Sequence, residues 1–150
     1  MQQILRKIGQ LSRCFETISN IEFKDYNLGR GQYLYLVRIN ENPGIIQGQL
    51  AELLNIDRTS VAKAIKKLES NGWVEKRESS LNKKELQLFP TEKGKDIYSF
   101  FKREGDYSSE VALRDFSKEE KQILLSMLDR MKQNIEPDWQ LVKRGIKRDY

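Results

Sequence analysis

Apolar residues recur at helical spacing near the start of the chain. They follow one another at steps of four, three, four and three residues: Ile4, Ile8, Leu11, Phe15 and Ile18. This spacing puts them on one side of a helix, which we expect over residues 2–21. A short terminal helix needs a surface to pack against, so the stripe favours packing on a helix of a second subunit. Packing within its own domain is the alternative that the pattern leaves open.

Two more predicted helices follow, separated by turn-forming residues. Asn, Gly and Arg residues at 27–31 break the first helical pattern, and Asn-Pro-Gly at 42–44 is a strong turn signal. A helix is therefore expected at about 31–41, and a further short helix at 47–54.

The next helix has clear signals at both ends. Asp57 is a suitable N-cap, because its carboxylate can accept the free amides of Thr59 or Ser60. Asn71-Gly72 is a typical C-terminal stop, so the helix is predicted over about 58–70. Its apolar positions define one buried face: Val61, Ala64, Ile65 and Leu68.

After that helix the apolar pattern changes from helical to alternating. Residues 73–77 and 85–89 are predicted strands, and the polar stretch 78–84 between them is a turn. Together they form a two-stranded hairpin with a charged tip. The chain thus places a helix-turn-helix directly before a β-hairpin.

The C-terminal part is predicted to be helical again. A long helix is expected over about 91–113, and Ser117 with Glu120 matches the capping-box pattern that begins a second one. Pro137 is expected to interrupt this last helix, leaving a short basic tail at 138–150. The apolar face of this last predicted helix includes Ile123, Met127 and Met131.

Composition narrows the classes of function. The chain has 27 Lys and Arg against 22 Asp and Glu, a net charge of +5, one cysteine and no histidine. A single cysteine rules out an intrachain disulfide framework, and the lack of histidine removes the commonest general base and metal ligand. We therefore expect neither an enzyme nor a metal site or cofactor. No signal peptide or membrane-spanning run is visible, which predicts a cytoplasmic protein with no membrane partner.

The predicted helix 58–70 carries the strongest functional signal. Its segment 58–68 has four cations and no acid, and a helix of this kind fits the major groove of DNA. The hairpin after it offers a second contact, to the minor groove or the backbone. The candidate DNA-binding residues are Arg58, Thr59, Ser60, Lys63, Lys66, Lys67, Arg77, Asn82, Lys83 and Lys84. A lysine-rich solvated face is the alternative for the helix taken alone.

The run QLAELLNIDRTSVAKAIKKLESNGWVEKRESSLNKKELQLFPTEKG resembles the MarR family of bacterial regulators, and in particular its SlyA-like members. The flanking helices are similar in number and order, so the resemblance covers nearly the whole chain. It implies a mainly α winged helix-turn-helix fold with a small β-hairpin and with N- and C-terminal dimerisation helices. The implied domains are a dimerisation helix and linker at 1–30, a DNA-binding domain at 31–90, and C-terminal helices at 91–150 that complete the dimerisation domain.

The resemblance also implies a function. It implies a transcriptional regulator that binds a pseudo-palindromic operator as a homodimer whose terminal helices interlock. Ile123, Met127 and Met131 of the last helix would then contribute to dimerisation. Recognition would involve Thr59, Ser60 and Lys63, and the wing would reach the minor groove. The chain departs from the family at the wing tip, because Ser79-Ser80-Leu81-Asn82-Lys83-Lys84 stands where relatives often carry an arginine. Lysine must serve there, or the wing contact is weaker and less selective for groove shape.

Three alternatives remain open at this point. Family members often bind small aromatic ligands, for which the candidate pocket residues are Phe15, Tyr26, Tyr33 and Trp73; ordinary core packing is the other interpretation of these rings. Cys14 lies in the first predicted helix, where it is either a peroxide sensor of a redox-regulated repressor or a small core residue. The third alternative is a winged helix that binds a protein instead of DNA.

Overall fold

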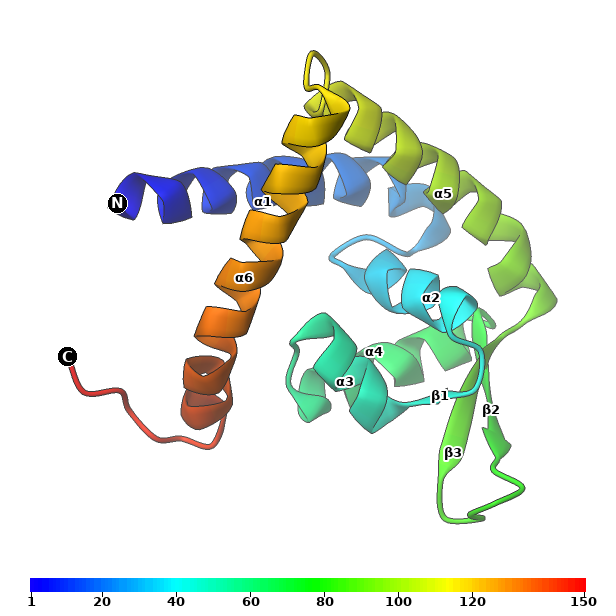
Figure 1. The fold of residues 1–150 in the computed structure, drawn as a ribbon. Helices are drawn as coiled ribbons and strands as arrows, with labels where there is room; N and C mark the ends of the chain where they lie inside the picture. The colour runs from blue at the N-terminus through cyan, green and yellow to red at the C-terminus, as the bar shows by residue number, and fades with distance from the viewer. The chain divides into compact units, whose positions relative to one another are not determined.

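The computed structural model describes all 150 residues and divides into two compact units, Met1–Asp106 and Tyr107–Tyr150. The second unit holds the end of α5 and the helix α6 (Lys118–Lys143). The first unit holds the remaining elements (Figure 1): α1 (Gln2–Glu22), η1 (Lys24–Tyr26), α2 (Gln32–Glu41), β1 (Ile45–Ile46), α3 (Gln47–Leu54), α4 (Arg58–Ser70), β2 (Val74–Glu78), β3 (Leu86–Pro90) and most of α5 (Glu92–Ala112). The predicted mainly helical fold with a small β-hairpin is confirmed. None of the helices combines the length and the hydropathy that crossing a membrane requires.

The sheet has one strand more than the sequence predicted. Its order is β1-β3-β2 and all pairs are antiparallel, with Ile45 opposite Leu88 and Val74 opposite Pro90. The third strand β1 has only two residues, and two consecutive β-branched isoleucines were the only signal for it. The β2–β3 hairpin extends away from helices α2 to α4 (Figure 1).

The core of the first unit lies between helices α2, α3 and α4 and the inner face of the sheet. The predicted apolar face of α4 is buried, which confirms the expected orientation of this helix. Two residues before α2 that the helical pattern did not single out, Phe23 and Leu28, are also fully buried. The largest fully buried side chains are Phe23, Leu28, Leu36, Ile39, Leu50, Ile65, Leu68 and Leu88.

The prediction that Pro137 interrupts the last helix is wrong. Helix α6 begins at the capping box, where Glu120 N donates to Ser117 Oγ at 3.1 Å, and continues through Pro137 to Lys143. A proline removes one backbone donor, but the side chains on either side still make helical pairs. Gln140 Nε2 donates to Glu136 Oε1 at 3.0 Å across the proline. Local interactions over 26 residues thus outweigh the loss of one hydrogen bond.

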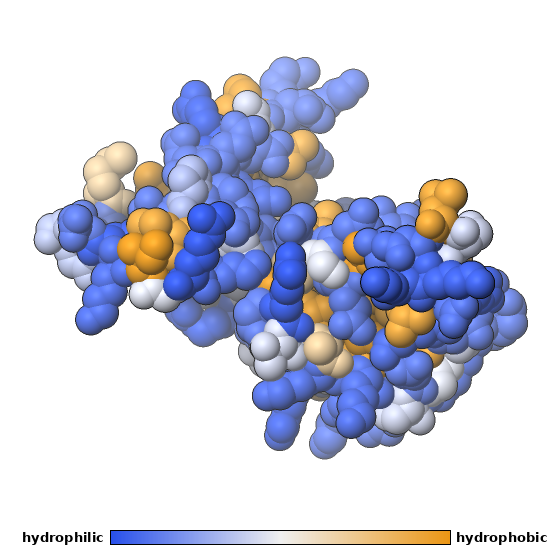
Figure 2. All heavy atoms as spheres, turned by 90° about the horizontal axis from the view of Figure 1, so that it is seen from below, coloured by the Kyte–Doolittle hydropathy of each residue, from blue (hydrophilic) through white to orange (hydrophobic).

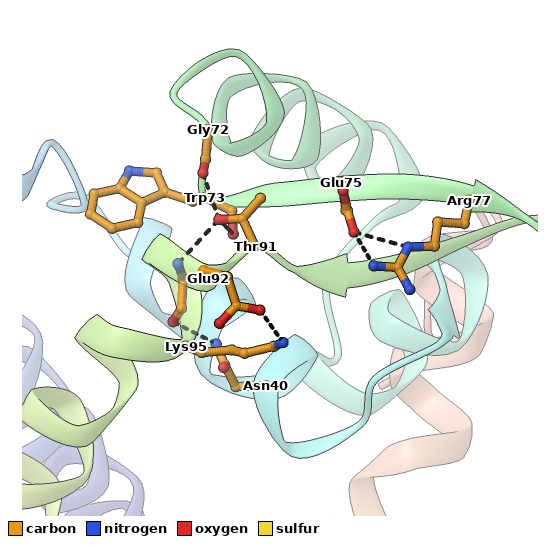
Figure 3. Close-up of polar contacts among 9 residues, drawn as sticks. Asn40, Gly72, Trp73, Glu75, Arg77, Thr91, Glu92 and Lys95 are labelled. Atoms are coloured by element: carbon orange, nitrogen blue, oxygen red, sulfur yellow. Dashed lines mark hydrogen bonds and ion pairs between the residues drawn. The ribbon is translucent and has the colours of Figure 1, made fainter.

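The first turn of α5 is tied to the end of α4 through Thr91 (Figure 3). Its hydroxyl donates to the carbonyl of Gly72 at 2.7 Å and accepts from the amide of Gly94 at 3.1 Å. Its own amide donates to the carbonyl of Trp73 at 3.1 Å. Gly94 lies so close to this carbonyl that a Cβ at position 94 would be 2.3 Å from the Trp73 oxygen. Only glycine therefore fits at this position.

Two further side chains strengthen the same junction. Lys93 Nζ donates to the carbonyl of Asn71, the C-cap of α4, at 3.0 Å and lies 3.8 Å from the ring centroid of Trp73. A cation at this position also complements the negative end of the α4 dipole. From α2, Asn40 Nδ2 donates to the carbonyl of Gly94 at 3.2 Å (Figure 3). The junction therefore connects α2, α4 and α5.

The other end of α4 is fixed by the predicted N-cap. Asp57 Oδ1 accepts from the amide of Ser60 at 2.8 Å, which satisfies one of the free amides of the first turn. Hydrogen bonds from Ser60 hold the pKa of the Asp57 carboxyl below its ordinary value. The ionised carboxylate therefore stabilises the helix end at neutral pH.

We predict that Gly94→Ala destabilises the protein by about 2 kcal/mol, because the added methyl collides with a backbone oxygen that is itself hydrogen-bonded. Urea unfolding at fixed protein concentration measures the change. Gly48→Ala is the matched control: no atom lies within 4 Å of a Cβ at that position in α3, so helix propensity should raise stability by about 0.5–1 kcal/mol. Equal effects of the two substitutions would contradict the role of the close contact.

We predict that Asp57→Ala lowers the melting temperature at neutral pH, whereas Asp57→Asn lowers it less because asparagine is also a good N-cap. The lowered pKa means that the carboxylate contributes stability above the pKa of an unfolded aspartate, about 3.9, and loses it as the pH falls through the folded value. The gap between wild type and Asp57→Ala should therefore shrink on acidification. The gap between Asp57→Asn and Asp57→Ala should stay constant, and a parallel decrease would exclude this assignment.

Candidate nucleic-acid interface

One face of α4 is exposed to solvent. The side chains predicted to point outward are all exposed, and they lie opposite the buried apolar face: Arg58, Thr59, Ser60, Lys63, Lys66 and Lys67. Figure 2 views the molecule from the side toward which the β2–β3 hairpin points in Figure 1, and most of the surface seen there is hydrophilic. The exposure of its six polar side chains leaves the outward face of α4 uncovered by the rest of its unit.

The positive charge of this face is not neutralised within the chain. No ion pair engages the four cations of the exposed face, whereas the nearby acids have partners of their own. Glu69 Oε2 lies 2.9 Å from Lys76 Nζ of β2, and Asp57 is occupied by the Ser60 amide. The helix thus presents ammonium, guanidinium and hydroxyl donors, which suit phosphates and the acceptor edges of guanine.

The loop between β2 and β3 has a shape fixed by its own side chains. The buried hydroxyl of Ser79 accepts from the amides of Leu81 and Asn82 at 3.2 and 3.4 Å. Asn82 Oδ1 accepts from the amide of Lys84 at 3.1 Å. The predicted contact residues Asn82, Lys83 and Lys84 are all exposed on this loop. Asn82 therefore also helps to shape the loop that presents the two lysines.

Arg77 is held on the side of the hairpin, away from its tip. Its Nε donates to Glu75 Oε1 at 2.9 Å, and its Nη2 contacts the same oxygen (Figure 3). Its guanidinium carbon lies 4.5 Å from the ring centroid of Phe89 on β3. Glu75 partly neutralises the arginine and orders it. The predicted strand already placed residues 75 and 77 on one face, but the pairing of their side chains was not predicted.

A residue that sequence reasoning did not propose stands at the tip of the loop. Leu81 is apolar and yet 97% exposed, and the residues next to it in the loop are all polar. In the sequence it is the single apolar residue between Ser79 and Glu85, which is the only signal that singles it out.

The four aromatic residues proposed for a ligand pocket do not gather in one place. Tyr33 packs against Phe23 with ring centroids 4.8 Å apart, and Tyr26 packs against Phe100 at 5.8 Å in the same aromatic cluster. Trp73 is buried beneath the ammonium group of Lys93. Phe15 is exposed on α1. The ligand-pocket assignment stays a prediction.

The apolar stripes proposed for dimerisation are open to solvent in the single chain. In the first unit, α1 exposes Ile4, Ile8, Leu11 and Phe15. In the second unit, Ile123 and Met127 of α6 are exposed and Met131 is half-buried. Cys14 is also exposed on α1, and no cluster of side chains in the chain could hold a metal ion. The stripes leave two helices without a partner for their apolar sides.

Comparison with known proteins identifies relatives over the full length. Residues 28–86 match the MarR family. An uncharacterized HTH-type transcriptional regulator of Bacillus subtilis (strain 168), YybA, is 57% identical over 150 residues, which cover 100% of both chains. An identity this high over both whole chains shows that this protein and YybA belong to one family.

Solved structures agree with this assignment. A MarR-family transcriptional regulator from Listeria monocytogenes, crystallised with a 26-mer DNA, is 51% identical and has a TM-score of 0.93, with 97% of each chain covered. The transcriptional regulator SlyA is 50% identical with a TM-score of 0.88, covering 93% of this chain and 98% of the other. The winged-helix fold and the resemblance to SlyA-like proteins are thereby confirmed, and the chain belongs to the MarR family of transcriptional regulators.

Proposed function

We propose that the protein binds double-stranded DNA sequence-specifically, as a homodimer on a pseudo-palindromic operator. The observation that carries this proposal is the exposed face of α4, whose cations have no acidic partner, followed in the same unit by a hairpin with two exposed lysines. The similar Listeria protein was crystallised with DNA, which supports the same class of partner. In this proposal the protein acts on DNA in the cytoplasm.

Each group of residues has a distinct role in the proposal. Thr59, Ser60 and Lys63 lie toward the start of α4, which is the part of a recognition helix that reaches base edges, and Arg58 can donate to guanine. The remaining candidates would contact phosphates and fix the register without reading sequence: Lys66, Lys67, Arg77, Asn82, Lys83 and Lys84.

The dimer is proposed from the apolar sides of α1 and α6. Exposed apolar stripes on two long helices favour association with another helix surface, and a second copy supplies the same stripes. Segments 1–30 and 91–150 would then form the dimerisation part and 31–90 the DNA-binding part. A two-fold dimer places two α4 helices in successive major grooves, about 10 base pairs apart.

Regulation by a small aromatic effector is part of the proposal. Tyr26 and Tyr33 lie in one cluster of rings, and Tyr26 is 40% exposed at its edge. A flat aromatic molecule would extend this cluster by stacking.

Selection of bound DNA from a random pool tests the core of the proposal. We expect enrichment of one motif with two-fold symmetry and a half-site spacing of about 10 base pairs, together with a steep fall of affinity with salt. A pool that remains random after repeated rounds would reject sequence-specific binding. Affinity without any motif would leave only a non-specific binder.

We predict different effects for lysines on the helix and on the hairpin. Lys63→Ala should cost on the order of 1–3 kcal/mol on the selected site and relax the preference at one base pair. Lys83→Ala should weaken binding to all sequences alike and reduce the slope of log affinity against log salt. Titration of selected and scrambled duplexes at several salt concentrations measures both. If Lys83→Ala changed the preference at a single base pair only, its assignment to the backbone would be wrong.

We predict that Leu11→Glu dissociates the dimer, because it places a charge in the middle of the α1 stripe. Sedimentation at micromolar concentration should give a monomer, and affinity for the full operator should fall toward that for one half-site. Thr17→Glu is the matched control, since it adds the same charge to an exposed position on another side of α1. A wild-type protein that sediments as a monomer would contradict the proposed dimer.

A further inference from the structure

The side chain of Leu81 is presented at the tip of the hairpin by a fixed backbone. The amide of Leu81 donates to Ser79 Oγ at 3.2 Å, and the same hydroxyl accepts from the amide of Asn82. The side chain itself is 97% exposed and packs on nothing. A single exposed leucine is ordinary on a flexible surface. Here the loop is ordered by its own hydrogen bonds while its most prominent side chain is apolar.

The charges around Leu81 indicate the kind of partner that covers it. Lys83 and Lys84 follow it on the same loop and are exposed, and the nearest acids, Glu78 and Glu85, lie where the loop joins the strands. The tip is therefore apolar at its centre and positive at its side. An apolar protein surface would leave both ammonium groups without a counter-charge, whereas the minor groove of DNA has negative walls and a narrow floor.

We propose that Leu81 enters the minor groove and packs on the floor of an A·T base pair beside each half-site. This inference rests on the proposed DNA binding and adds a determinant of specificity to it. An A·T pair presents only acceptors in the minor groove, while a G·C pair adds the N2 amino group of guanine. Leucine has neither donor nor acceptor, so it removes water from the acceptors on the floor of either pair. On G·C it would also remove water from the amino group without replacing that hydrogen bond, which is an additional cost. The leucine therefore discriminates against G·C.

This contact differs from the one that an arginine makes in the same groove. An arginine contact displaces counterions and weakens as salt rises. A leucine contact removes apolar surface from water, so its contribution does not depend on counterion release. Salt dependence therefore separates the role of Leu81 from the role of Lys83.

Base substitution with inosine tests the proposal directly. Inosine keeps the major-groove edge of guanine and lacks the N2 amino group, so I·C resembles A·T in the minor groove. On the operator obtained by selection, each A·T pair flanking the half-sites is replaced by G·C and by I·C. For wild type we expect one position per half-site where G·C weakens binding on the order of tenfold and I·C restores it.

Variants of Leu81 assign that preference to its side chain. Leu81→Ala should bind the A·T operator several-fold more weakly and lose the discrimination, with an unchanged salt slope, since no charge is removed. Leu81→Met, which keeps an apolar side chain of similar size, should retain the preference. Ser80→Ala, an exposed neighbour on the same loop, is the control and should bind like wild type. Because the Leu81 side chain has no packing contacts, these variants should melt at the wild-type temperature.

Three results would overturn the inference while leaving DNA binding intact. An A·T preference that persists in Leu81→Ala, or the absence of any such preference, would mean that the leucine does not read the groove. I·C behaving like G·C would place the discrimination in the major groove. Failure of the proposed function is a different result, in which the wild-type protein binds no duplex, and it overturns the inference as well.

Discussion

The close contact between Gly94 and the carbonyl of Trp73 fixes how α4 and the β2–β3 hairpin are joined to the start of α5. Three successive carbonyls, of Asn71, Gly72 and Trp73, follow the end of α4, and all three accept hydrogen bonds from the first turn of α5 or the residue before it. Carbonyl groups at the end of a helix have no partner within the helix, so without α5 these three would depend on water for their hydrogen bonds. Glycine at 94 lets two backbones approach within a distance that no side chain permits. The orientation of α4 and the start of β2 are thus set by one junction.

The acidic side chains near the proposed recognition face bind groups other than the cations of that face. Asp57 caps α4, Glu69 pairs with Lys76 and Glu75 pairs with Arg77. Each of these acids stabilises or orders an element that supports the interface, and none forms an ion pair with the four cations of the exposed α4 face. The protein therefore keeps a modest net charge of +5 and still presents a locally uncompensated positive surface. The local distribution of charge, more than the net charge, determines how strongly a polyanion is attracted to this surface.

Local signals predicted the helices well because they are encoded within a few residues. The cap at Asp57, the stop after Asn71 and the buried stripe of α4 all lie in one continuous segment, and α4 has the predicted bounds. Strand β1 was missed since two residues carry no periodicity, and its pairing with β3 joins positions 45 and 88. The expected break at Pro137 failed for the opposite reason: a local rule was applied to a helix long enough to absorb one missing hydrogen bond.

The geometry of the candidate interface could be predicted in part, while its role in binding stays a prediction. The outward face of α4 follows from the helical period, so its residues could be named from the sequence. The pairing of Arg77 with Glu75 and Phe89, and the presentation of Leu81 by Ser79, depend on the folded hairpin. A polar loop with one leucine has no preferred conformation until the strands on either side are paired, so its exposure could not be inferred.

The proposed function links two features of the chain. The recognition surface on α4 is short, and the apolar stripes on α1 and α6 are exposed. One recognition helix offers only a few base contacts, each worth about 1–3 kcal/mol of discrimination. That is too little to select one site among the many competing sites of a genome. Linking two such helices makes the second binding event intramolecular, which multiplies affinity without any new type of contact. In the proposed dimer, the apolar sides of α1 and α6 that a single chain leaves exposed would supply that link. The surface that is costly for an isolated chain would then be the one on which the specificity of the dimer depends.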